Sequence, residues 1–325
     1  MKLNGSLTMT NSSQSHEVYI PQRFRKQITL HIFKNYYANK HQDFKTPLIL
    51  AISGPPGMGK TYQTNSVLDD LGVSKSSVSG AEFESENAGI PAKNILNIYK
   101  SVSDDVFDRK IEFGAIIIDD IDAALGQWGG LVQYTMNRQL LIKTLIDLAD
   151  NPYNLTTIDE YGSLQCYATC RIPLIVTLND ETKMYEPLMR NGRTTIFPWI
   201  PKEEEISNIL GNIFSDIMFT ESNNCLSPYD LYRCLLTYIK EKINANISTL
   251  PLSLFSDIKS AIHDDYLWEE LCCSSSFDIV ARNFEKKIYS PIVCEFSKVL
   301  TIGGRLIHKS INYLSSNNFN DISNK

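Results

Sequence analysis

The chain has 325 residues, of which 43% are hydrophobic and 21% charged, and its formal net charge is −6. This composition is typical of a globular protein large enough for one or two domains. The negative charge disfavours a dedicated nucleic-acid binder, and no apolar run reaches the ~20 residues of a membrane span. Because the N-terminus also lacks the apolar core of a signal peptide, we expect a cytoplasmic protein without membrane or nucleic-acid partners. Seven cysteines without metal-site spacing are interpreted as reduced thiols.

The first part of the chain divides into two segments. Residues 1–16 are rich in Ser, Asn and Thr and are predicted to be disordered. Between Pro21 and Tyr37, apolar residues recur at helical spacing, which predicts an amphipathic helix with arginines and lysines on its remaining surface. Such a basic surface is compatible with nucleic acid, but a helix packed beside a nucleotide domain is the favoured interpretation.

The segment SGPPGMGKTY, residues 53–62, follows the apolar run PLILAI and matches the pattern G-x-x-x-x-G-K-[ST]. Glycines let the backbone curl so that successive N–H groups face one anion, and the following helix adds its positive end. We expect Lys60 to bind the β- and γ-phosphates of ATP and Thr61 to ligate Mg²⁺. The alternative is a turn rich in glycine and proline that holds no ligand. The predicted nucleotide-binding residues are Gly54, Pro55, Pro56, Gly57, Met58, Gly59, Lys60, Thr61 and Tyr62.

Further strand-like runs follow along the chain, at 76–80, 113–119 and 171–178. Helical patterns separate these runs, and this alternation predicts an α/β fold with a parallel sheet covered on both faces. The run 194–200 closes this part. From Pro201 onward, three glutamates suit the first turn of a helix, and the pattern then stays helical almost to the end. We therefore place a domain boundary near residue 200.

The second component of the predicted site is AIIIDDID, residues 115–122. An apolar strand that ends in acids places carboxylates at the edge of the sheet where open α/β proteins bind ligands. We expect Asp119 to hold Mg²⁺ through water and Asp120 to polarise the attacking water, while Asp122 caps or braces the turn. The alternative is a strand followed by an acidic turn without catalytic function.

Polar residues after the next strand supply the third component. Asn179 ends an apolar run, a position from which an amide can touch both the γ-phosphate and water. Arg190 and Arg193 are three residues apart, so both can reach one anion, and they follow Asn179 too closely to reach back easily to the same site. Arginines so placed suit a neighbouring subunit's nucleotide. The alternative is a surface turn with two solvated arginines.

The succession of these motifs resembles the AAA+ ATPases and, within them, the Rubisco activase family. The resemblance is carried by SGAEFESENAGIPAKNIL (79–96), DDIDAALGQWGGLVQYTMNRQLLIKTLIDLADNPYNL (119–155) and RIPLIVTLNDETKMYEPLMRNGR (171–193). A weaker likeness continues through 252–271 and 296–314. In all, the resemblance covers roughly residues 17 to 320, and its central segments are far more specific than the phosphate loop alone.

The resemblance implies an ATP-driven hexameric ring that releases inhibitory sugar phosphates from Rubisco. It implies an AAA+ nucleotide-binding domain over 17–200 and an α-helical lid domain over 201–325. Segments 82–92 and 124–134, the second with Trp128, are implied to face a central pore. Carried over by position, the resemblance assigns Lys60 and Thr61 to the phosphate loop, Asp119 and Asp120 to the acidic pair, Asn179 to the sensor, and Arg190 and Arg193 to the arginine fingers.

This chain departs from the family at two of these places. Family members often carry Asn–Asp where this chain has Asp119–Asp120. Their lid carries arginines in the segment that matches 257–263, where this chain has Lys259 as its basic residue and a neutral Ala261. The alternative function is a AAA+ ATPase that remodels another protein client or loads a nucleic-acid complex. A phosphate-loop small-molecule kinase and a nucleotide-gated scaffold are weaker alternatives.

Overall fold

The structure is a computed structural model that describes residues 18–80, 89–122, 132–158, 163–222, 224–242, 249–273, 280, 282 and 291–318. The predicted disordered segment 1–16 lies outside these residues. So do Trp128 and most of the two segments that were expected to face a pore. Within the described residues, no helix combines the length and apolar composition needed to cross a membrane.

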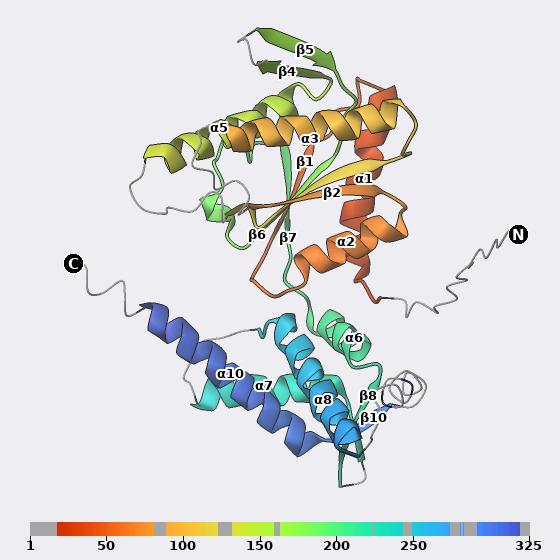
Figure 1. Ribbon diagram of the computed structural model, residues 1–325, viewed down its shortest axis with the longest axis vertical. Helices are drawn as coiled ribbons and strands as arrows, with labels where there is room; N and C mark the ends of the chain where they lie inside the picture. Colours follow the sequence, from red (N-terminus) through yellow and green to blue (C-terminus); the bar gives the residue numbers. More distant parts are fainter. Residues whose placement is uncertain are drawn as a thin grey trace, which may run out of the picture.

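A parallel sheet of five strands forms the centre of the first part of the chain (Figure 1). Its spatial order is β2-β3-β6-β1-β7, and every pairing is parallel. The strands are β1 (Ile49–Ser53), β2 (Ser74–Ser79), β3 (Gly114–Asp119), β6 (Leu174–Leu178) and β7 (Thr194–Pro198). β1, β2, β3 and β6 correspond to the strand-like runs predicted from the sequence, and β7 lies in the run 194–200 that closes this part of the chain.

The three middle strands read as continuous apolar runs because both of their faces are buried. Alternate residues point to opposite faces, so Leu50 and Ile52 join one hydrophobic core while Ile49 and Ala51 join the other. Helices α1 (Gln22–Lys40) and α2 (Lys60–Asp70) cover the first face. Helices α3 (Ile90–Phe107) and α5 (Val132–Asp150) cover the second. The α/β fold predicted from alternating elements is confirmed.

A hairpin at the far end of the α/β part was not predicted (Figure 1). Strands β4 (Asn154–Ile158) and β5 (Leu164–Ala168) pair antiparallel and form a separate small sheet. Leu164 is 71% exposed, and most of β5 is exposed with it. Leu155 is buried and joins the second core together with its cross-strand partner Tyr167, but most of β5 is exposed. The sequence of the hairpin therefore lacks the sustained alternation of apolar residues by which strands are recognised.

The elements from α6 onward, here called the helical part, lie together below the main sheet in Figure 1. The helices are α6 (Glu203–Ile213), α7 (Pro228–Lys242), α8 (Leu252–Cys273) and α10 (Phe296–Asn318). A small sheet that the sequence did not predict accompanies them, in the order β10 (Ile292–Glu295), β8 (Ile217–Glu221), β9 (Asn224–Leu226). The division into domains at residue 200 remains our proposal, supported by this separation of the α/β and helical elements.

His31 lies in the core between α1 and the sheet, where its Nε2 is 3.1 Å from the Leu174 carbonyl oxygen. Burial lowers its pKa to about 4, and the charge of Arg171 adds to this effect. The unfolded chain, with a pKa near 6.5, takes up the proton first. The folded state therefore keeps its full stability above pH 6.5 and loses it as the pH falls towards 4, by about 3 kcal/mol.

This prediction can be checked by urea unfolding of the wild type and of His31→Gln, which keeps a donor for Leu174 but does not titrate. At about pH 7 the wild type should be the more stable protein, and its advantage should shrink at about pH 5. Comparing the two proteins cancels the titration of other groups. A difference in unfolding free energy that does not change with pH would contradict the prediction.

Candidate nucleotide-binding site

The three predicted motifs meet at one edge of the central sheet. Strand β6 lies between β3 and β1, and the three run parallel, so their carboxyl ends are neighbours. The phosphate loop leaves β1, the acidic pair ends β3, and Asn179 follows β6. This edge is where open α/β sheets bind their ligands.

The phosphate loop has the backbone that its glycines allow. Gly57 and Gly59 have φ angles of 74° and 73°, in the left-handed region that side chains disfavour. At Gly54 a Cβ atom would lie 2.1 Å from the carbonyl oxygen of Trp199, so only glycine fits there. The indole Nε1 of Trp199 donates to the Met58 carbonyl at 2.9 Å. The loop is therefore held in shape by the residue that follows β7.

Trp199 also links the loop to the helical part. Its ring is fully buried and packs edge-on against Phe24 at 4.7 Å between centroids. The guanidinium of Arg23 lies over the same ring at 4.4 Å and forms an ion pair of 2.7 Å with Glu205 in the first turn of α6. A continuous set of contacts thus joins the phosphate loop, α1 and α6.

Lys60 is the first residue of α2, and its side chain is buried at the base of the loop. Its ammonium donates to the carbonyls of Gly54 (2.7 Å) and Pro55 (3.1 Å) and to Oδ1 of Asn179 (2.8 Å). Burial lowers the pKa of Lys60, and the nearby carboxylates, Asp120 foremost, oppose that shift. The ammonium is thus partly desolvated and close to acidic groups, which suits a group that binds phosphate.

Thr61 and Asp119 bring two oxygen ligands to one point. Oδ1 of Asp119 accepts from the hydroxyl of Thr61 and from that of Thr177, each at 2.5 Å. Mg²⁺ takes oxygen ligands and is commonly held by a hydroxyl and one or two carboxylates together with substrate phosphates. The residues present therefore fit the predicted metal.

Asp120 has an unusual backbone and an altered acidity. Its φ angle is +48°, a conformation that Asp and Asn tolerate better than other side chains, and its N–H donates to the Thr177 hydroxyl at 2.9 Å. Burial raises the pKa of its carboxyl, and the charges of Asp119 and Asp122 raise it further. A carboxylate with raised pKa is a better proton acceptor than an ordinary aspartate, as a catalytic base requires.

Asp122 supports the sensor position. It is 6% exposed, and its Oδ2 accepts from the backbone N–H of Asn179 at 3.1 Å. The side-chain amide of Asn179 in turn lies 3.5 Å from Oδ1 of Asp120. Asp122 therefore braces the end of β6, whereas the sequence interpretation assigned it to the turn after its own strand. Asn179 lies between the lysine and the acidic pair.

The cleft around these groups has a volume of about 630 Å³ and extends to the helical part. Its apolar end comes from scattered positions that carry no motif: Val18, Tyr19, Ile209, Ile213 and Leu252. Polar residues of α6 and α8 complete it, among them Asn212, Ser256 and Lys259. The ammonium of Lys259 donates to the Ile213 carbonyl and pairs with Asp216, each at 2.7 Å. Of these residues, only Lys259 was noted in the sequence.

The structure brings most of the predicted site residues together. Those that line the cleft are Pro56, Gly57, Met58, Gly59, Lys60, Thr61, Tyr62, Asp120 and Asn179. Gly54 and Pro55 contribute carbonyls to Lys60, and Asp119 is bound to Thr61. Arg190 and Arg193 do not line the cleft, which agrees with the expectation that they do not reach back to it. Their role at a neighbouring site remains a prediction.

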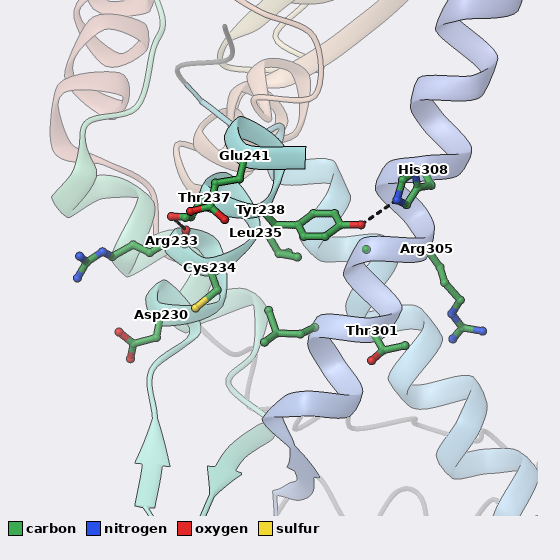
Figure 2. Close-up of a pocket in the computed structure, with 12 residues that line it drawn as sticks. Asp230, Arg233, Cys234, Leu235, Thr237, Tyr238, Glu241, Thr301, Arg305 and His308 are labelled. Carbon is green, nitrogen blue, oxygen red and sulfur yellow. Dashed lines mark hydrogen bonds between the residues drawn. The ribbon is translucent and has the colours of Figure 1, made fainter. Parts of the chain in front are cut away.

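A second cavity, of about 960 Å³, lies between α7 and α10 (Figure 2). At one end of it the hydroxyl of Tyr238 is 2.8 Å from Nε2 of His308, and the side chains of Arg233 and Arg305 point away on opposite sides. None of the predicted site residues lines it. We therefore assign the nucleotide to the smaller cleft.

A phosphate loop between β1 and α2, with acids after β3, places the chain among the phosphate-loop nucleotide-binding proteins. Comparison with known protein families identifies which kind of phosphate-loop protein this chain resembles. Residues 50–202 match the family model described as AAA, the ATPase family associated with various cellular activities, so this part of the chain is an AAA ATPase domain. The predicted fold, an AAA+ domain followed by a helical lid, is confirmed.

The chain is similar to curated Rubisco activases, which confirms the resemblance predicted from the sequence. It is 38% identical over 196 residues to ribulose bisphosphate carboxylase/oxygenase activase 1 of Nicotiana tabacum, a match that covers 60% of this chain and 43% of the tobacco protein. It is 34% identical over 249 residues to the activase of an Anabaena species, covering 77% of this chain and 55% of that protein. The chain thus spans about half the length of the curated relatives it matches.

Proposed function

We propose that this protein is an ATP-hydrolysing AAA+ motor that acts like Rubisco activase, releasing inhibitory sugar phosphates from Rubisco. The observation that carries the proposal is the convergence of Lys60, the Thr61–Asp119 pair, Asp120 and Asn179 on one cleft. The similarity to activases supports the choice of client.

Each group in the cleft has a distinct task in ATP hydrolysis. The backbone of the phosphate loop and the Lys60 ammonium bind the phosphates, and the apolar end of the cleft takes the base. Thr61 and Asp119 would hold Mg²⁺, which when bound neutralises charge on the phosphate oxygens. Asp120 polarises the attacking water and accepts its proton. Asn179 orients that water beside the γ-phosphate.

Lys60 connects nucleotide binding to the sensor. Its ammonium is shared among three oxygen acceptors, one of them Oδ1 of Asn179. Phosphate oxygens compete with these acceptors because they carry more negative charge. Nucleotide binding therefore releases the Asn179 side chain towards the γ-phosphate and the water.

The proposed assembly is a homo-oligomer, a hexameric ring, in which the segment carrying Arg190 and Arg193 faces the nucleotide of the next subunit. Such an arginine finger contributes roughly 10³–10⁵ in rate. A cytoplasmic location belongs to the same proposal. It is supported by the composition and by the seven free cysteines.

The test is ATP hydrolysis by the purified chain with Mg²⁺, measured alone, with Rubisco inhibited by a sugar phosphate, and with DNA. We expect hydrolysis that recovers carboxylase activity from inhibited Rubisco, whereas Lys60→Ala protein recovers none. Hydrolysis that is stimulated by DNA and leaves Rubisco inhibited would favour the nucleic-acid alternative. Nucleotide binding without hydrolysis under all three conditions would indicate a nucleotide-gated scaffold.

A further inference from the structure

The segment between β6 and β7 carries two arginines whose surroundings differ. All three guanidinium nitrogens of Arg193 donate hydrogen bonds: Nε and Nη2 donate to the two carboxylate oxygens of Asp150 at 2.7 and 2.6 Å, and Nη1 donates to the Pro187 carbonyl at 2.6 Å. The Arg190 side chain is exposed and makes no hydrogen bond or ion pair with another residue in the described part of the chain. Arg190 is therefore free to bind an anion.

Backbone bonds hold the same segment in one shape. The N–H groups of Arg193 and Thr194 both donate to the Arg190 carbonyl, at 3.1 and 3.4 Å, and the Thr194 hydroxyl donates to Leu188. The Arg193 carbonyl accepts from Ile49 at the start of β1. Arg190 thus lies in a turn that is fixed by hydrogen bonds before and after it. The Arg193 side chain connects that turn to Asp150 at the end of α5.

The ion pair is better suited to setting geometry than to stabilising the fold. The side chains of Asp150 and Arg193 are 42% and 23% exposed, and exposed ion pairs contribute little to the free energy of unfolding. A two-point contact between guanidinium and carboxylate nevertheless fixes the direction of both groups. The hydrogen bond to Asp150 also raises the pKa of Arg193, which favours the charged form of the guanidinium.

Resting on the proposed function, we propose that Arg190 alone is the arginine finger, and that Asp150 and Arg193 form a positioning pair that presents Arg190 to the neighbouring subunit's nucleotide. A guanidinium whose donors are already bound to a carboxylate and a carbonyl has little charge or hydrogen-bonding capacity left for a phosphate. The exposed Arg190 has both. Asp150 thereby acquires a role in hydrolysis although it touches no nucleotide.

The finger role of Arg190 and the positioning role of the Asp150–Arg193 pair can be tested by separate substitutions. Arg190→Ala should lower kcat by about 10³-fold or more. Asp150→Arg and Arg193→Asp should each lower kcat about tenfold or more with little change in KM for ATP, because the phosphate loop is intact. The double variant Asp150→Arg/Arg193→Asp rebuilds the pair in reverse and should recover most of the wild-type kcat. A merely structural pair would change the melting temperature instead, which should stay near the wild-type value in all of these proteins.

A matched control is the exposed Arg25–Asp70 pair between α1 and α2, with a separation of 2.6 Å. Its reversal should leave kcat unchanged.

Mixing Arg190→Ala with Lys60→Ala protein should restore turnover, because each subunit supplies what its neighbour lacks. No recovery on mixing would overturn the finger assignment of Arg190. A reversed Asp150/Arg193 pair as inactive as Arg190→Ala would overturn the positioning role, since Arg193 itself would then be required. Wild-type turnover no higher than that of Lys60→Ala would overturn the proposed function and this inference together.

Discussion

Replacing Lys60 by alanine is expected to lower ATP turnover by at least about 10²-fold and to weaken MgATP binding. The Lys60 ammonium is the buried cation of the phosphate loop, and its removal takes charge-assisted hydrogen bonds away from the β- and γ-phosphates. Turnover can be followed by phosphate release, and binding by titration calorimetry with a non-hydrolysable ATP analogue.

Two further variants make the result specific. Lys60→Met keeps the length of the side chain and removes only the charge, so it should be as inactive as the alanine variant. Lys110→Ala removes an exposed lysine that pairs with Asp105 on the surface, and it should behave like the wild type. If either Lys60 variant were folded and hydrolysed ATP at the wild-type rate, the assignment of the site would be wrong.

Asp120→Asn is expected to bind ATP and leave it uncleaved, with kcat lowered by about 10²–10⁴-fold. Asparagine retains an oxygen that can orient water but cannot take up its proton. It is also the best substitute at a φ of +48°, because Asn tolerates the left-handed region whereas a change to alanine would add backbone strain. Tight nucleotide binding together with lost turnover would distinguish the loss of a base from misfolding.

The pH dependence of kcat provides a second check on Asp120. Burial and the neighbouring aspartates raise the pKa of its carboxyl, and only the ionised form is a base. In the wild type, kcat should therefore fall as the pH drops through this raised pKa, and the fall should begin at a higher pH than for an ordinary aspartate. The residual activity of Asp120→Asn should not show this fall of kcat at low pH. Wild-type hydrolysis by the variant would indicate that another carboxylate, such as Asp122, activates the water.

The sequence predicts the polar half of the cleft because the parallel strands of one sheet end at the same edge. Once PLILAI, GAIIID and LIVTL are recognised as strands of one sheet, the residues that follow them must share an edge. Gly59, Lys60, Asp119, Asp120 and Asn179 could therefore be expected near one another without knowledge of the strand order. The alternation of strands and helices along the sequence was likewise sufficient to predict the α/β fold class.

The remaining features depend on contacts that have no local signature. Tyr19 and Leu252 both line the cleft although they come from segments far apart in the chain, and each alone resembles any other apolar residue. Asp150 and Arg193 are 43 residues apart and pair only because α5 and the turn before β7 end at the same place. The strands of the helical part are three to five residues long, too short for alternation to be recognised.

The position of Trp199 has a thermodynamic consequence. Its backbone N–H donates to Ser53 at 2.6 Å, its indole holds Met58, and through Arg23 it is connected to Glu205 on α6. We therefore expect the shape of the phosphate loop and the orientation of the helical part to change together. Such coupling is reciprocal: if nucleotide changes the affinity of the helical part for a partner by some factor, the partner changes the affinity for nucleotide by the same factor. If the proposed client or a neighbouring subunit holds the helical part, we expect it to alter the affinity for nucleotide without touching the nucleotide.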